Sequence, residues 1–130
     1  MNVIGLWYED EFPWPDPREL VGPPLEDKVQ IVAYLRSGVR VHEQLGYSHC
    51  RFPEGPPPEQ MGNCELTDGS WIWPEGLWVY VHFFDVRLPD EFIQHVRGAN
   101  YRHDCTWSEE LEMAPMRHAF WNEWSRSVGK

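Results

Sequence analysis

The chain has 130 residues and a formal net charge of −10. A chain of this length can bury a core without disulfides or a metal, so we expect a single domain over 1–130. The negative charge argues against nucleic acid as a direct partner, because phosphate binding requires a concentrated positive surface. No apolar run of about 18 residues and no basic start followed by an apolar block is present, so we expect a cytoplasmic protein with no membrane partner.

Acidic residues are concentrated at the start of the chain. Residues 1–27 contain seven acids and one base. The acids at 9–11 are followed by three prolines at every second position, which remove N–H donors and favour extended backbone. We interpret 1–22 as a candidate acidic extended arm, whose apolar beginning suits a short strand or an ordered segment. Alternatively, Phe12 and Trp14 fold back onto the core and the acids are merely solvated.

Helical spacing and end signals predict helices in four parts of the chain. The clearest helix follows Pro24, has acids in its first turn and ends before Gly38. The segment 77–84 also has the propensity of a strand, but we favour a helix because Pro74 suits a helix start and the apolar residues then line one face. The other two helices are predicted over 89–97 and over 108–127, the latter kinked or split at Pro115.

A tight hairpin is predicted at Asp68-Gly69, because both residues tolerate the positive φ angles of such turns. The hairpin joins strands over 61–66 and 70–73, and two more antiparallel strands are expected over 39–44 and 47–52. The proline-rich segment 53–60 is expected to be a loop. The prediction is therefore an α+β fold with an N-terminal helix, a four-stranded antiparallel meander, and two to three helices packed on the sheet.

The sequence contains eight tryptophans. Trp71 and Trp73 alternate with Ile72 on a predicted strand, so both point to one face, and we favour the core over an exposed platform. Three tryptophans are less constrained and are the better candidates for a surface role: Trp14, Trp107 and Trp121.

The chain also contains three cysteines and six histidines, the residue types used in zinc sites and in thiol catalysis. No C-x-x-C pair occurs, and no local sequence signature identifies a catalytic pair of cysteine nucleophile and histidine base. The odd cysteine count suits free thiols in a reducing compartment. We therefore expect no cofactor, no metal and no catalytic residue at Cys50, Cys64 or Cys105. A small Cys/His metalloprotein or an enzyme of unknown substrate is the alternative.

Three segments carry a resemblance to a known family: GYSHCRF, MGNCELTDGSWIWPEGL and VRLPDEFIQHV. They resemble a family of uncharacterised small bacterial proteins, over about residues 34–97. The resemblance implies a shared α+β scaffold and a bacterial source, and it assigns no catalytic residue. In size, acidity and lack of a catalytic motif, the chain is also similar to immunity proteins of bacterial toxin systems.

We therefore expect a protein-binding inhibitor, an immunity protein that neutralises a cognate bacterial toxin by occluding its basic active site. Acidic residues would steer the encounter and aromatic residues would anchor the complex. A subunit of a larger assembly is a further alternative. The candidate partner-binding residues are Glu9, Asp10, Glu11, Trp14 and Asp16 in the arm, and Glu109, Glu110 and Glu112 near the last helix.

Overall fold

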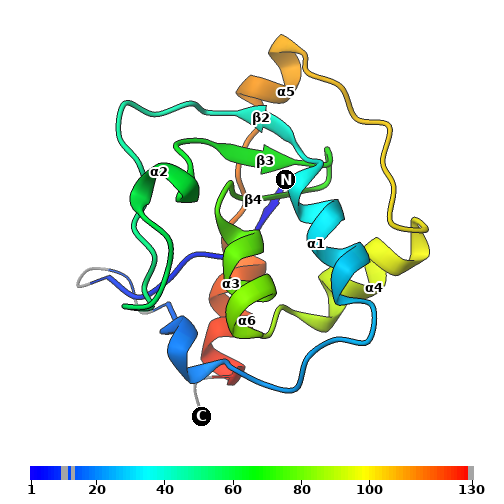
Figure 1. The fold of residues 1–130 in the computed structure, drawn as a ribbon. Coiled ribbons are helices and arrows are strands. Elements are labelled where there is room, and N and C mark those ends of the chain that lie inside the picture. Colours follow the sequence, from blue (N-terminus) through cyan, green and yellow to red (C-terminus); the bar gives the residue numbers. More distant parts are fainter. Residues whose placement is uncertain (10–11, 13, 129–130) are drawn as a thin grey trace.

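The computed structural model describes residues 1–9, 12 and 14–128. Over these residues the fold is α+β, with six α-helices, one short 3-10 helix and a four-stranded sheet (Figure 1). No helix in this part of the chain is both long and apolar enough to span a membrane. In chain order the elements are β1 (Asn2–Val3), η1 (Pro17–Glu19), α1 (Lys28–Arg36), β2 (Val39–Val41), α2 (Pro58–Met61), β3 (Glu65–Thr67), β4 (Trp71–Pro74), α3 (Leu77–Phe84), α4 (Asp90–Gly98), α5 (Glu109–Met113) and α6 (Ala119–Val128).

The sheet is mixed, with the strand order β1-β4-β3-β2. The antiparallel pairs β2–β3 and β3–β4 include the hairpin predicted at Asp68-Gly69. β1 runs parallel to β4, with Val3 opposite Ile72. The predicted antiparallel meander is therefore wrong, and the chain begins with a strand instead of a helix. The apolar start of the chain is buried by this pairing, since Val3 and Ile4 are 1% and 0% exposed.

β1 also contacts a segment from near the end of the chain. The N–H of Val3 donates to the carbonyl of Arg117 at 3.0 Å, and the N–H of Arg117 donates to the carbonyl of Met1 at 2.8 Å. On its other side, the N–H of Ile4 donates to the carbonyl of Ile72 at 3.0 Å. β1 is thus held between β4 and the residues that precede α6.

The strand predicted over 47–52 is also wrong. The alternation of apolar and polar side chains along β2 ends at His42, and the φ of 55° at this residue turns the chain out of the sheet. The following segment keeps only isolated backbone bonds, such as that from the N–H of Ser48 to the carbonyl of Gly62. Within the predicted loop, α2 begins at Pro58, where a missing N–H costs nothing.

The helix predictions are closer to the structure. The segment 77–84 is a helix and not a strand, and Asp85 ends it in the left-handed conformation with φ of 51°. The helix predicted over 89–97 corresponds to α4. The long helix predicted over 108–127 is split into α5 and α6 around Pro115, because proline cannot donate within a helix.

The two faces of the sheet carry two separate apolar clusters. Trp71 and Trp73 lie in the larger cluster, which α1, α3, α4 and α6 complete. This confirms that both tryptophans belong to the core. The smaller cluster contains Val3, Val41 and Ile72 on the opposite face of the strands, and residues of the α5 segment cover it. The second cluster fixes the position of α5.

Candidate functional site

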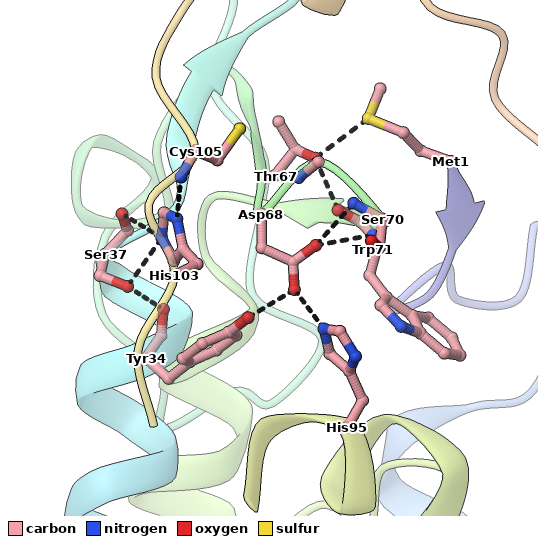
Figure 2. A network of polar contacts seen from close by, with 11 residues as sticks. Met1, Tyr34, Ser37, Thr67, Asp68, Ser70, Trp71, His95, His103 and Cys105 are labelled. Atoms are coloured by element: carbon pink, nitrogen blue, oxygen red, sulfur yellow. Dashed lines mark hydrogen bonds and ion pairs between the residues drawn. The ribbon is translucent and has the colours of Figure 1, made fainter. Parts of the chain in front are cut away.

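A buried carboxylate lies at the centre of a network of polar contacts (Figure 2). The side chain of Asp68 is 1% exposed. Its Oδ1 accepts from the N–H groups of Ser70 and Trp71 at 2.9 and 2.8 Å. Its Oδ2 accepts from the hydroxyl of Tyr34 at 2.5 Å and lies 2.8 Å from Nε2 of His95. All four lone-pair positions of the carboxylate are therefore in use.

The electrostatics of Asp68 identify it as a structural anion. Burial by itself raises its pKa, but the hydrogen bonds from Tyr34 and from the turn outweigh burial, and the pKa lies below its ordinary value. Burial and the adjacent carboxylate raise the pKa of Tyr34, so its hydroxyl stays a donor. Asp68 is consequently ionised and saturated with donors, which leaves it unsuited to act as a nucleophile or a base.

The same region contains His103 and Cys105. Nδ1 of His103 accepts from the N–H of Cys105 at 3.2 Å, so Nε2 carries the proton and donates to the carbonyl of Ser37 at 3.1 Å. Burial and the carboxylate of Asp68 raise the pKa of the Cys105 thiol. A nucleophilic cysteine needs the opposite shift. The network therefore fastens α1, the β3–β4 turn and α4 to one another and offers no activated nucleophile.

The cysteines and histidines do not form a metal site in the part of the chain that the structure describes. No group of three or more His, Cys, Asp or Glu side chains is placed there to hold an ion. Cys50, Cys64 and Cys105 are free thiols. Burial, together with the hydrogen bond to Glu75, raises the pKa of Cys64 to about 12, which keeps this thiol protonated.

The aromatic residues of the arm pack on the rest of the molecule. The indole N–H of Trp14 donates to Oδ1 of Asn122 at 2.9 Å, and Phe12 stacks on Trp14 with 4.6 Å between ring centroids. Trp14 also packs against the larger apolar cluster. This side chain is therefore not free to anchor a partner without leaving α6.

Two acids of the arm have cationic neighbours within the molecule. Glu9 lies 3.5 Å from Arg51. Asp16 pairs with Arg18 at 2.7 Å, and this contact lowers the pKa of Asp16. The other two candidates, Asp10 and Glu11, lie outside the described residues.

The acids of the second candidate group lie on α5. The hydroxyl of Ser108 accepts from the N–H of Leu111 at 3.0 Å and caps this short helix. Leu111 packs on the smaller apolar cluster. Helical geometry then places Glu109 and Met113 on the side of α5 opposite Leu111, where Met113 is 81% exposed.

Glu112 orients an exposed tryptophan beside α5. Its carboxylate accepts from the N–H of His42 at 2.6 Å and from the indole N–H of Trp107 at 3.2 Å. These two hydrogen bonds lower the pKa of Glu112. Trp107 is 54% exposed, and it lines a shallow hollow of about 200 Å³ together with Arg40, Val41, Glu43 and Glu112. Within this hollow Arg40 lies 3.6 Å from Glu43. We call this region the α5 surface and define it as Glu43, Trp107, Glu109, Glu110, Glu112 and Met113.

The structure does not bring the two predicted groups together. α5 lies at the top of the view in Figure 1, whereas the blue helical turn η1, which directly follows Asp16, lies at the lower left. Of the tryptophans considered for a surface role, Trp107 is exposed, but Trp121 is fully buried and the expectation for it was wrong. Met113 and Glu43 were missed. Met113 follows Glu109 by four residues, so a helix over this segment places the two side chains next to each other on one face.

Comparison of the chain with models of protein families, with curated proteins and with solved structures finds no match.

Proposed function

We propose that this protein is an inhibitor that binds a basic protein through its α5 surface, in the manner of an immunity protein that occludes the active site of a cognate bacterial toxin. The observation that carries the proposal is the composition of this surface. Two large apolar side chains, Trp107 and Met113, are exposed there among four carboxylates. Tryptophan is enriched among the residues that contribute most of the binding energy of protein interfaces, and polar residues form the rim around such anchors.

Charge supports a basic partner. Glu109 and Glu110 are exposed and pair with no cation among the residues that the structure describes. Their potential adds to that of a chain with a net charge of −10. Such a field accelerates the encounter with a positively charged surface and repels acidic competitors.

The α5 surface is also held in place before any partner arrives. Beneath it, Leu111 and Met116 pack on Val3, Val41 and Ile72. The hydrogen bonds of Glu112 fix the backbone at His42 and the ring of Trp107 from the side. A preorganised surface loses little conformational entropy on binding, so more of its contact energy contributes to affinity.

The test uses the protein as bait in extracts of its native host, followed by identification of the bound protein. We expect one basic partner whose own enzymatic activity is lost in the complex. The double substitution Glu109→Lys and Glu110→Lys should slow association about tenfold or more at low salt, with a smaller difference at high salt. Trp107→Ala should mainly accelerate dissociation, with a loss of about 2 kcal/mol or more.

A matched control is the double substitution Glu54→Lys and Glu123→Lys, which changes the net charge equally at two exposed positions away from α5. It should slow association much less. Equal loss of association rate in both double variants would show that only the overall charge matters, and it would remove the α5 surface from the proposal.

A further inference from the structure

Two adjacent helices of this acidic protein contain no acidic residue. α1 and α3 have the sequences KVQIVAYLR and LWVYVHFF, although the chain has 21 Asp and Glu residues. Lys28, at the start of α1, donates to the carbonyl of His82 near the end of α3 at 3.1 Å. At the other end, the guanidinium of Arg36 lies 4.4 Å from the ring centre of Trp78. The helices are therefore antiparallel neighbours (Figure 1).

The outer side of this helix pair is apolar and exposed. Val29 is 81% exposed and Phe83 is 57% exposed. The ring of Phe83 lies 4.5 Å from that of His82 and 6.0 Å from that of Trp78, measured between centroids. We call this side the α1–α3 face and define it as Val29, Ala33, Arg36, Trp78, His82 and Phe83.

We propose that the α1–α3 face is the interface of a symmetric homodimer. Two copies that each carry a charge of −10 repel one another in most orientations. None of the six residues that define the α1–α3 face is acidic, and the carboxylates at its two ends, Asp85 and Glu75, are paired with Lys28 and Arg40 at 2.9 and 2.8 Å. The contact also removes exposed apolar area from water. A twofold axis brings the same face of each copy together, which makes such a contact self-complementary.

A hollow lies at one end of the face. It has a volume of about 530 Å³ and is lined by Gly38, Leu66, Trp78 and the polar side chains of Arg36, Arg40, Gln60 and Glu75. Positions 78 and 83 are about 7.5 Å apart along a helix axis. If the two copies of α3 cross in opposite directions, with the twofold axis between these positions, Phe83 of the partner subunit lies near this hollow and close to the guanidinium of Arg36. An aromatic ring inserted into a pocket is a common anchor of interfaces.

The dimer leaves the α5 surface accessible. In Figure 1, α5 is at the top of the molecule, well separated from the helix pair in the centre. The two surfaces should also respond to salt in opposite ways. Salt screens the repulsion between two acidic copies and strengthens the dimer, whereas it weakens a complex between the α5 surface and a basic protein. The dimer can therefore be tested on the purified chain alone, without the proposed partner.

The experiment is sedimentation velocity of the full chain over a range of protein concentrations, at low and at high KCl. We expect a reversible dimer whose dissociation constant falls as KCl rises. Phe83→Glu and, separately, Val29→Glu should each raise that constant more than about tenfold, because each buries an unpaired charge in the interface. Leu45→Glu is the control, since it adds the same charge at an apolar position that is fully exposed and lies outside the α1–α3 face.

Circular dichroism and urea unfolding should show that all three variants are folded, since each substituted side chain is exposed. A wild-type chain that stays monomeric at every concentration and both salt levels would overturn the proposal. The proposal would also be overturned if Leu45→Glu raised the dissociation constant as much as Phe83→Glu and Val29→Glu do. A dimer that weakens as KCl rises would overturn it as well.

Discussion

The carboxylate of Asp68 receives donors from three separate parts of the chain: the β3–β4 turn, α1 and α4. Its place in a tight turn is predictable, because Asp-Gly is a local turn signal. Its bonds to Tyr34 and His95 are not predictable from local pattern, because those residues meet Asp68 only after the helices have packed. The sequence thus indicated where Asp68 lies but not what it holds together.

Replacement of Asp68 by asparagine should destabilise the fold. The amide places an NH₂ group where the carboxylate accepts two hydrogen bonds, so buried donors lose their partner. We expect Asp68→Asn to lower the free energy of unfolding by about 2–4 kcal/mol, measured by urea denaturation. Asp104→Asn removes the same charge at an exposed position and should change it by less than about 0.5 kcal/mol. A similar loss in both variants would contradict the role given to the network.

The lowered pKa of Asp68 predicts how the free energy of unfolding depends on pH. The folded-state pKa is lowered relative to about 3.9 in the unfolded chain. The contribution of Asp68 to stability is therefore fully present above about pH 4 and is lost as the pH falls through the folded-state value. The unfolding free energy of the wild-type chain should fall more steeply on acidification below about pH 4 than that of Asp68→Asn. Parallel curves would show that the carboxylate is not the titrating group.

At the scale of elements, β1 and α5 show what a local pattern can and cannot establish. The apolar run that contains β1 was compatible with a short strand, yet hairpin signals favour pairing between sequence neighbours. The parallel partner of β1 is β4, which lies far along the chain. For α5, Pro115 predicted the break and the three glutamates were visible in the sequence. The cluster that fixes α5 joins residues from both ends of the chain and has no local signature.

Ile4 tests whether the start of the chain is part of the cooperative fold. Its side chain is 0% exposed. Ile4→Ala should therefore lower the free energy of unfolding by about 2–5 kcal/mol in urea denaturation, through lost burial and a residual cavity. Val21→Ala shortens a side chain that is 53% exposed and should have a much smaller effect. An unfolding free energy for Ile4→Ala equal to that of the wild type would mean that the segment is not packed in solution.

At the scale of the whole molecule, charge is distributed unevenly over the surface of the fold. The chain has 21 acidic and 11 basic residues, yet the α1–α3 face has no acid and the α5 surface has four. The net charge and its concentration at the start of the chain were evident from the sequence. The acid-free face was not, because α1 and α3 become neighbours only in the folded chain.

The excess of carboxylates should make thermal stability depend on salt. Repulsion among them is stronger in the compact state than in the unfolded chain, and salt screens it. The melting temperature at neutral pH and low protein concentration should therefore rise as KCl is added. Glu54→Gln combined with Glu123→Gln, which removes two exposed carboxylates outside the first turn of any helix, should raise the melting temperature at low KCl and reduce its dependence on KCl. A melting temperature that falls with KCl would indicate that ion pairs outweigh repulsion.

The position of β1 between β4 and Arg117 has a consequence for biosynthesis. A ribosome releases β1 before either of its neighbours, yet the last of them is synthesised near the end of the chain. The apolar residues around Val3 and Ile4 therefore lack their native partners until the ribosome has passed first Ile72 and then Arg117. Long-range pairing of this kind is slow, and it leaves unpaired strands open to aggregation. The four-stranded sheet can form once β4 has been synthesised, but the bridge to Arg117 on the other side of β1 forms only after translation has passed that residue.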